Sequence, residues 1–262
     1  TQTACSTTEQ VRFFEDVGFE RAILERNLSA AEIVQIRGGS SIELEAFIHG
    51  AICVCHSGRC YLSRSTSERS GNRGQCSQPC RLPYDLTDGN GNIYIKGKHL
   101  LSVCDLDLSQ HIGQMIDAGV NSFKIEGRLK DRVYLRNIVS HYRRLLDEQI
   151  ALRDDCCRAS VGTSQIAFEP NPAKSFTRGG GTYLFDGKRA GVASFDTPKA
   201  LGERIGRVTK VARGSFMLDS NVALANGDGI CFIANGEAVG TNINTVNGSW
   251  ITPNRIDGIA VG

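Results

Sequence analysis

The chain has 262 residues, which is long enough for one large domain or two medium ones, each with a hydrophobic core. Its 30 basic and 28 acidic residues leave a formal net charge of +2, so no global charge excess indicates nucleic acid or a membrane surface. No apolar run reaches the roughly 18 residues of a membrane-spanning helix. We therefore expect a soluble globular protein with no membrane partner.

The N-terminal part of the chain alternates between helix and strand patterns. Residues 6–18, with Ser6 as the expected N-cap, and residues 29–36 each begin with a capping box and continue with apolar residues at helical spacing. Short apolar runs at 21–25 and 42–50 predict two buried strands. This alternation is typical of a parallel α/β fold.

The alternation resumes after residue 98. Residues 109–119 predict a helix, 120–127 a strand and 131–150 a long helix. Between the two α/β parts, the Asp-Gly and Asn-Gly steps of residues 84–98 predict a hairpin.

The domain organisation follows from a change in composition near residue 155. The glycine-rich tail carries short apolar segments, the first of them at 181–185, and these predict a small all-β, barrel-like module. We expect an α/β domain over 1–155 with a cysteine-rich insertion at 51–98, a linker over 156–175 and the β-rich module over 176–262.

The cysteine-rich insertion carries the strongest candidate for a metal site. Its spacing is Cys53-x6-Cys60-x15-Cys76-x3-Cys80, with Cys55 inside the first interval. An iron–sulfur cluster tolerates such wide spacing because each iron takes one thiolate, whereas structural zinc sites pair their ligands more closely. Zinc, disulfides and ordinary buried cysteines remain the alternatives. Uneven cysteine usage of this kind favours a reducing, cytoplasmic setting.

The same insertion is rich in arginine and contains little acid. A site built here would be cationic and suited to phosphate backbones or small carboxylates. The alternative is a solvated, mobile loop. The candidate phosphate-binding residues are Arg59, Arg64, Arg69, Arg73 and Arg81, which face only Glu68.

A family resemblance rests on four stretches of the chain. "ELEAFIHGAICVCHSGRCYLS" resembles the signature of the collagenase-like peptidase family U32, in which a Glu-x-Phe-x-His-Gly strand end runs into Cys-x6-Cys and a serine. "CSQPCRLPYDL", "KHLLSVCDLDL" and "SFKIEGRLKDRVYLRNIV" continue the match. Within the family, the chain is most similar to the branch that hydroxylates a cytidine of large-subunit ribosomal RNA; a sister branch acts on transfer RNA.

The resemblance implies a partial (β/α) TIM-like barrel, an iron–sulfur cluster of the 4Fe-4S type and prephenate as hydroxyl source. Carried over by position, the cluster ligands would be Cys53, Cys60, Cys76 and Cys80, and the role of Cys55 stays open. The expected function is hydroxylation of a pyrimidine, cytidine, in ribosomal RNA. The alternatives are a peptidase and a non-catalytic iron–sulfur RNA-binding factor.

In a parallel barrel, functional groups lie where strands end. That rule selects Glu25, Arg26 and Asn27 after the first strand, His49 at the end of the second, and Glu126 and Arg128 after the third. Arg26 and Arg128 could hold a carboxylate or phosphate, and His49 or Glu126 could move a proton. The alternative for each residue is a helix cap or a salt bridge at the barrel rim.

The number of strands gives one more expectation. A closed barrel needs eight parallel strands, and only three are predicted before the β-rich tail. We therefore expect an N-terminally incomplete chain with an open sheet, helices on one side of it, and poor solubility and activity in isolation.

Overall fold

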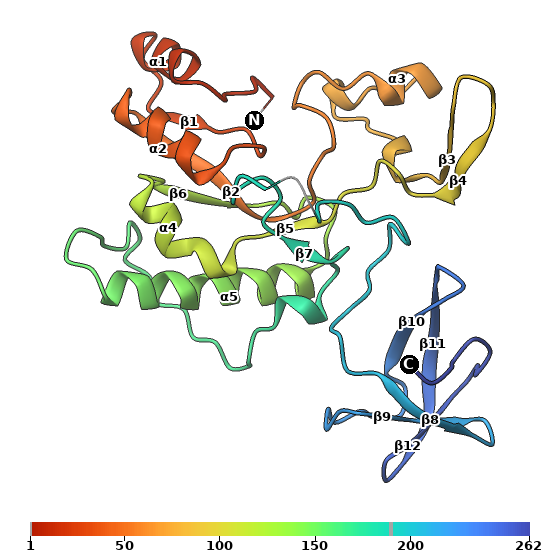
Figure 1. Ribbon diagram of the computed structural model, residues 1–262. Coiled ribbons are helices and arrows are strands. Elements are labelled where there is room, and N and C mark those ends of the chain that lie inside the picture. Colours follow the sequence, from red (N-terminus) through yellow and green to blue (C-terminus); the bar gives the residue numbers. More distant parts are fainter. Residues whose placement is uncertain (1, 189–190) are drawn as a thin grey trace. The chain divides into compact units, whose positions relative to one another are not determined.

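The computed structural model describes residues 2–188 and 191–262 (Figure 1). The chain forms two compact units, of which the first ends at Pro198 and the second is Lys199–Gly262. Sequence analysis placed residues 176–198 in the β-rich module, but the described part of this segment, residues 176–188 and 191–198, belongs to the first unit. The reason is non-local: Gly180–Gly181 pairs with a strand of the first unit, and Phe185 is buried in its core.

The first unit is built on a five-stranded sheet. Its strands are β1 (Arg21–Ile23), β2 (Glu43–Gly50), β5 (Asp105–Asp107), β6 (Ser122–Ile125) and β7 (Gly180–Gly181). The three strands predicted from sequence, β1, β2 and β6, are parallel neighbours, with β2 in the middle. β5 runs antiparallel to β2, and β7 runs parallel to β5. Within the described ranges this sheet does not close into a barrel, so the fold is mixed α/β and a TIM-like barrel is not confirmed.

Four helices pack with this sheet, and α4 and α5 lie side by side (Figure 1). The N-cap of α1 is Thr7 with Gln10, and not Ser6 with Glu9, because Thr7 has the extended backbone and accepts the amide of Gln10. The second predicted capping box, Ser29 with Glu32, is confirmed at α2. The helices are α1 (Thr8–Asp16), α2 (Ala30–Gly38), α4 (Ile112–Asp117) and α5 (Arg132–Ala151), with 3-10 turns at Ser109–His111 and Pro172–Lys174.

The core of the first unit follows from the alternation of side chains along β2. Leu44, Ala46 and Ile48 are buried and belong to one hydrophobic cluster with residues of all four helices. Glu45 and Phe47 lie between them in sequence, so they direct their side chains to the other face of the strand, where Glu45 pairs with Lys124 at 2.9 Å.

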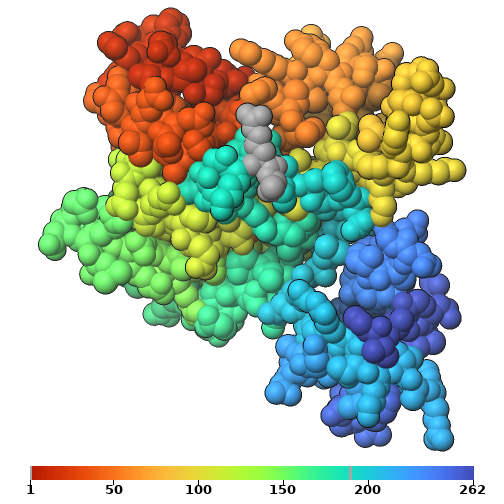
Figure 2. Space-filling view, viewed as in Figure 1, coloured from red at the N-terminus to blue at the C-terminus, as the bar shows by residue number. Residues whose placement is uncertain are grey.

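The insertion has little regular structure. It contains a short helix α3 (Leu62–Thr66), 3-10 turns at Gly71–Arg73 and Pro79–Arg81, and the predicted hairpin of β3 (Tyr84–Thr87) and β4 (Ile93–Lys98). In Figure 2 it forms a continuous part of the visible surface, coloured orange to yellow.

The second unit is all-β, as the composition of the tail predicts. Its five strands are antiparallel, in the order β10-β11-β12-β9-β8, around a small core of Phe216, Ile243 and Ile251. Their bounds are β8 (Val208–Ala212), β9 (Ser215–Leu218), β10 (Gly229–Ala234), β11 (Glu237–Asn247) and β12 (Trp250–Pro253). Across both units, the described helices include none with the length and apolar character of a membrane span.

Candidate functional site

Two adjoining cavities of about 340 and 320 Å³ lie where the strand ends of the first unit meet the insertion. Both are lined by Arg26 after β1, Glu126 after β6, and the cysteines at 53, 76 and 80. The carboxyl ends of β1 and β6, the two parallel strands that flank β2, therefore form one wall, and the insertion forms the other. This is the edge at which sequence analysis placed the candidate residues.

All five cysteines of the insertion line the 320 Å³ cavity. They are the four expected ligands, Cys53, Cys60, Cys76 and Cys80, together with Cys55. The other five cysteines of the chain do not line it, and all ten are free thiols. Among residues 2–188 and 191–262, no three His, Cys, Asp or Glu side chains lie close enough to hold a single metal ion. The five thiols of the insertion therefore line one cavity, and within the described ranges no three of them converge on a single ion position.

Local hydrogen bonds hold these cysteines in place. The Cys60 amide donates to Asn72 Oδ1 at 3.1 Å. The Cys76 sulfur accepts from the Gln78 amide at 3.3 Å and from the hydroxyl of the buried Ser63 at 3.6 Å. Because Ser63 Oγ also accepts the Ser77 amide at 3.1 Å, it fixes the backbone beside Cys76.

Desolvation controls the protonation of the thiols. Burial raises the pKa of Cys53 and of Cys80, and the nearby guanidinium groups of Arg26 and Arg81 only partly oppose it. In the metal-free protein the thiols of Cys53 and Cys80 therefore stay protonated at neutral pH, and binding of a metal centre to them would release protons.

Arg26 and Glu126 form the fixed polar pair of the site. Arg26 Nη2 lies 3.1 Å from Glu126 Oε2, and its guanidinium lies 3.9 Å from the centre of the Phe47 ring. Glu126 Oε1 accepts the Arg128 amide at 3.2 Å. Gly50 makes this geometry possible, because a Cβ there would lie 2.4 Å from the Glu126 carbonyl oxygen.

The 340 Å³ cavity has a cationic lining. The guanidinium of Arg128 has no hydrogen-bond or ion-pair partner among the described residues, and Lys130 only packs on the rings of Phe176 and Tyr134. Arg178, in contrast, is paired with the buried Asp105 at 2.7 Å. Sequence reasoning missed Lys130 and Arg178: the first lies inside a loop, and the second lies beyond the expected domain boundary.

The five candidate RNA-binding arginines differ in their contacts. Arg81 is half-buried and donates to Ile52 O, Val103 O and Ser102 Oγ at 2.7 to 2.9 Å. Exposed Arg69 donates to the Gln75 and Cys76 carbonyls, and exposed Arg64 to the Glu68 carbonyl. Arg59 and Arg73 are exposed, and their guanidinium groups make no hydrogen bond or ion pair within the described ranges. Arg81 therefore supports the fold of the insertion, whereas Arg59 and Arg73 have the most accessible charge.

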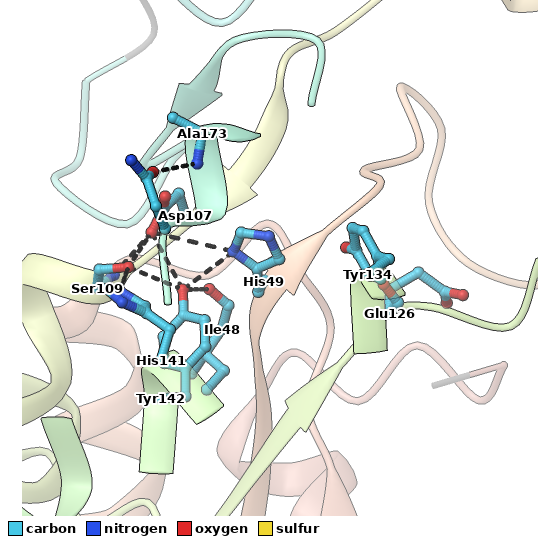
Figure 3. Close-up of polar contacts among 10 residues, drawn as sticks. Ile48, His49, Asp107, Ser109, Glu126, Tyr134, His141, Tyr142 and Ala173 are labelled. Carbon is cyan, nitrogen blue, oxygen red and sulfur yellow. Dashed lines mark hydrogen bonds and ion pairs between the residues drawn. The ribbon is translucent and has the colours of Figure 1, made fainter. Parts of the chain in front are cut away.

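His49 lies outside both cavities and belongs to a separate buried network (Figure 3). Its Nδ1 is 3.2 Å from the hydroxyl of Tyr142 and 4.0 Å from Asp107. The Tyr142 hydroxyl also lies 2.9 Å from the Ile48 carbonyl and 3.1 Å from Asp107 Oδ1. Figure 3 shows the side chain of Glu126 pointing away from this network. The structure therefore does not bring His49 and Glu126 into one site.

This network also contains a serine next to a histidine, the arrangement that a serine nucleophile would need. Ser109 Oγ lies 2.9 Å from His141 Nε2. Asp107, however, accepts the Ser109 amide and hydroxyl and makes no hydrogen bond with His141 Nδ1 in the described part of the chain, so it does not orient the imidazole as a catalytic triad requires. Asp107 instead fixes the turn that leads into α4.

Comparison with known proteins gives consistent matches. The family model for peptidase family U32 matches residues 1–191. The chain is 44% identical to the 23S rRNA 5-hydroxycytidine synthase of Escherichia coli over 246 residues, which are 94% of this chain and 38% of that protein. It is 41% identical to tRNA hydroxylation protein P1 of Bacillus subtilis over 58% of this chain and 37% of that protein.

A third relative is a collagenase of Porphyromonas gingivalis, 38% identical over 42% of this chain and 30% of that protein. The chain thus spans less than two fifths of the length of each of these relatives. No solved structure matches significantly. Since the family model covers most of the chain, including the whole cysteine-rich insertion, the chain belongs to peptidase family U32.

Proposed function

We propose that this chain is part of an enzyme that hydroxylates a pyrimidine in large-subunit ribosomal RNA, converting cytidine to 5-hydroxycytidine. The observation that carries the proposal is the 44% identity to a 23S rRNA 5-hydroxycytidine synthase over 94% of the chain. Relatives named as tRNA hydroxylation proteins support the coarser statement that the reaction is hydroxylation of an RNA base.

The proposal assigns a 4Fe-4S cluster to Cys53, Cys60, Cys76 and Cys80. A cubane cluster takes one thiolate at each of four separate irons, and four thiols around a cavity of about 320 Å³ suit that arrangement. The zinc alternative requires the ligands to converge on one ion, which the described side chains do not do. A cluster bound here would supply one-electron transfer chemistry.

The proposal assigns the 340 Å³ cavity to a small carboxylate co-substrate, with prephenate as the hydroxyl source. Arg128 and Lys130 line this cavity without a carboxylate partner, and a guanidinium can hold a carboxylate through two parallel hydrogen bonds. Arg26 is already bound to Glu126, so its part is to position that carboxylate beside the cysteines.

The RNA would approach the insertion. Its exposed arginines Arg59 and Arg73 can contact phosphates or lie against unstacked bases. The insertion lies on the surface and also supplies the cavity wall, so an RNA bound there would place a splayed base near the cysteines.

The test is mass spectrometry of ribosomal RNA from a strain that lacks the gene. We expect 5-hydroxycytidine to disappear and to return with the full-length protein, but not with its Cys60→Ser variant. Cys156→Ser, at a cysteine outside the cavity, is the matched control and should restore the modification. Unchanged hydroxycytidine in the deletion strain would refute the enzyme proposal. Accumulation of unprocessed peptides in that strain would favour the peptidase alternative, and retained RNA binding with no base change would favour a non-catalytic factor.

A further inference from the structure

Three consecutive residues after β1 carry buried polar atoms without a partner. Among the described residues only five such side-chain atoms occur, and three of them are Glu25 Oε2, Arg26 Nε and Asn27 Oδ1. Leaving a buried polar atom unpaired costs about 1–3 kcal/mol. Three consecutive residues with unpaired buried atoms at the end of a strand therefore indicate that a bound partner completes their hydrogen bonds.

The same three residues line one small cavity of about 120 Å³, beside Cys53 and Tyr183. One water occupies roughly 30 Å³ in the liquid, so a single water does not fill this space. Since Cys53 also lines the two larger cavities, the small cavity opens next to the proposed cluster site.

The unpartnered groups are held rigidly. Glu25 is only 6% exposed, and its other oxygen, Oε1, accepts the hydroxyl and the amide of Ser57 at 2.9 and 3.3 Å. The Asn27 side chain is fixed through Nδ2, which lies 3.2 Å from His56 Nδ1, so Oδ1 remains as an acceptor. The Arg26 guanidinium is fixed by Glu126 and Phe47, which leaves Nε–H as a donor.

We infer that this cavity binds the base that is modified, and that Glu25, Arg26 and Asn27 select cytosine over uracil. This inference rests on the proposed function. Cytosine presents an amino group beside ring acceptors, which complements two acceptor oxygens and one N–H donor; uracil has a carbonyl oxygen in place of the amino group. The ring of Tyr183 supplies an aromatic surface of the kind on which flipped bases stack.

Charge argues against a cation as the occupant. The Arg26 guanidinium lies in the same wall as Glu25, so an ammonium group or a metal ion would meet a positive charge. A neutral base with one amino group satisfies both acceptors without that repulsion.

The test compares cytidine 5′-monophosphate with uridine 5′-monophosphate in titrations of the full-length protein, followed by ligand-observed NMR. We expect a preference for the cytidine nucleotide of about tenfold or more, since one good base contact gives about 1–3 kcal/mol of discrimination. Glu25→Gln should remove most of this preference, because an amide can turn its NH₂ toward the amino group while its oxygen keeps the bond to Ser57. Glu20→Gln, at the exposed start of the same segment, is the matched control and should retain it.

Three results would overturn the inference: no binding of either nucleotide, equal binding of both, or an unchanged preference in Glu25→Gln. Ordered water alone in the cavity of a nucleotide-soaked crystal would do so as well. The readout is separate from the test of function. A strain that keeps its hydroxycytidine would refute the reaction but not a measured cytosine preference, and loss of the preference would leave the rRNA result standing.

Discussion

Two polar clusters lie at strand ends of the first unit's sheet and differ in how completely their hydrogen-bonding groups are paired: one follows β1 and β6, and the other joins β2, β5 and α5. In the cluster beside the cysteines, Arg128 has no partner and Glu25, Arg26 and Asn27 keep unpaired buried atoms. In the His49 cluster, the Tyr142 hydroxyl lies within hydrogen-bond distance of His49, Asp107 and the Ile48 carbonyl. Among the described residues, no buried side-chain atom of this cluster is unpaired.

We propose that this difference reflects function: ligands would complete the first cluster, whereas the second cluster supports the fold. Buried polar groups in native proteins are almost always paired, so the unpaired set is the one that a ligand completes. The paired set joins β2, β5 and α5 through side chains. If this distinction is correct, changes in the His49 cluster should alter stability alone, and changes beside the cysteines should alter ligand binding.

The largest effect is expected at Gly50, where both clusters meet. Its φ of +104° disfavours any other residue, and an added Cβ would lie 2.4 Å from the Glu126 carbonyl. Gly50→Ala should lower the free energy of unfolding by about 3 kcal/mol or more, measured by urea denaturation with circular dichroism. Gly89→Ala in the hairpin, where a Cβ meets nothing within 4 Å, is the control and should change little. Equal losses at both positions would contradict the steric argument.

Tyr142→Phe should cost about 1–3 kcal/mol of folding free energy, because the Ile48 carbonyl and Asp107 lose a buried hydroxyl partner. Iron content after anaerobic purification should not change. Tyr94→Phe, at a tyrosine 70% exposed, is the matched control for removal of a hydroxyl. A loss of iron in Tyr142→Phe with normal folding would mean that the two clusters act as one.

The His49 cluster should also make the protein sensitive to acid. Burial lowers the pKa of His49, and burial lowers that of His141. Below pH 6.5 these histidines become protonated in the unfolded chain but stay neutral in the folded chain. The free energy of unfolding is therefore highest above that pH and falls as the pH drops toward the folded-state pKa. One histidine contributes at most about 1.4 kcal/mol per pH unit.

Urea titrations between pH 7.5 and 5 would measure this slope. His49→Gln should flatten it, and His56→Gln, at an exposed histidine, should leave it unchanged. An equal slope in both variants would assign the acid sensitivity to other groups.

Local patterns in the sequence were enough to predict the elements that depend on local physics. The capping box at Ser29, the apolar periodicity of α5 and the turn residues of the hairpin were each sufficient. β5 was missed because it is three residues long and its first residue, Asp105, is a buried carboxylate. That carboxylate is stabilised by Arg178, 73 positions later in the chain, and no local pattern carries such a pairing.

The sequence was enough to predict which residues lie at the strand ends, but not which way each of their side chains points. The strand-end rule selected Glu25, Arg26 and Glu126, which the structure places around adjoining cavities. It also selected His49, which faces the helix α5. The pairing of β2 with β6 shifts register between Phe47 and His49, and a shift of one residue turns a side chain to the other face of a sheet. Such a bulge depends on the neighbouring strand, so the β2 sequence alone does not show it.

The smallest expected effect concerns the arginines of the insertion, where the same distinction between paired and unpaired groups applies. Exposed Arg59 and Arg73 should contact RNA phosphates, so replacing both by Ala should reduce the slope of log affinity against log salt by about 1.4, at 0.7 per phosphate contact on single strands. Fluorescence anisotropy with a single-stranded RNA oligonucleotide would measure this slope, with Arg12→Ala on α1 as the control.

Arg81→Ala should instead lower stability and iron content, because Arg81 hydrogen-bonds the backbone before Cys53 and lies next to Cys80. An unchanged salt slope in the double variant would show that these charges are only solvated, and a reduced slope in Arg81→Ala with normal folding would reverse the assignment.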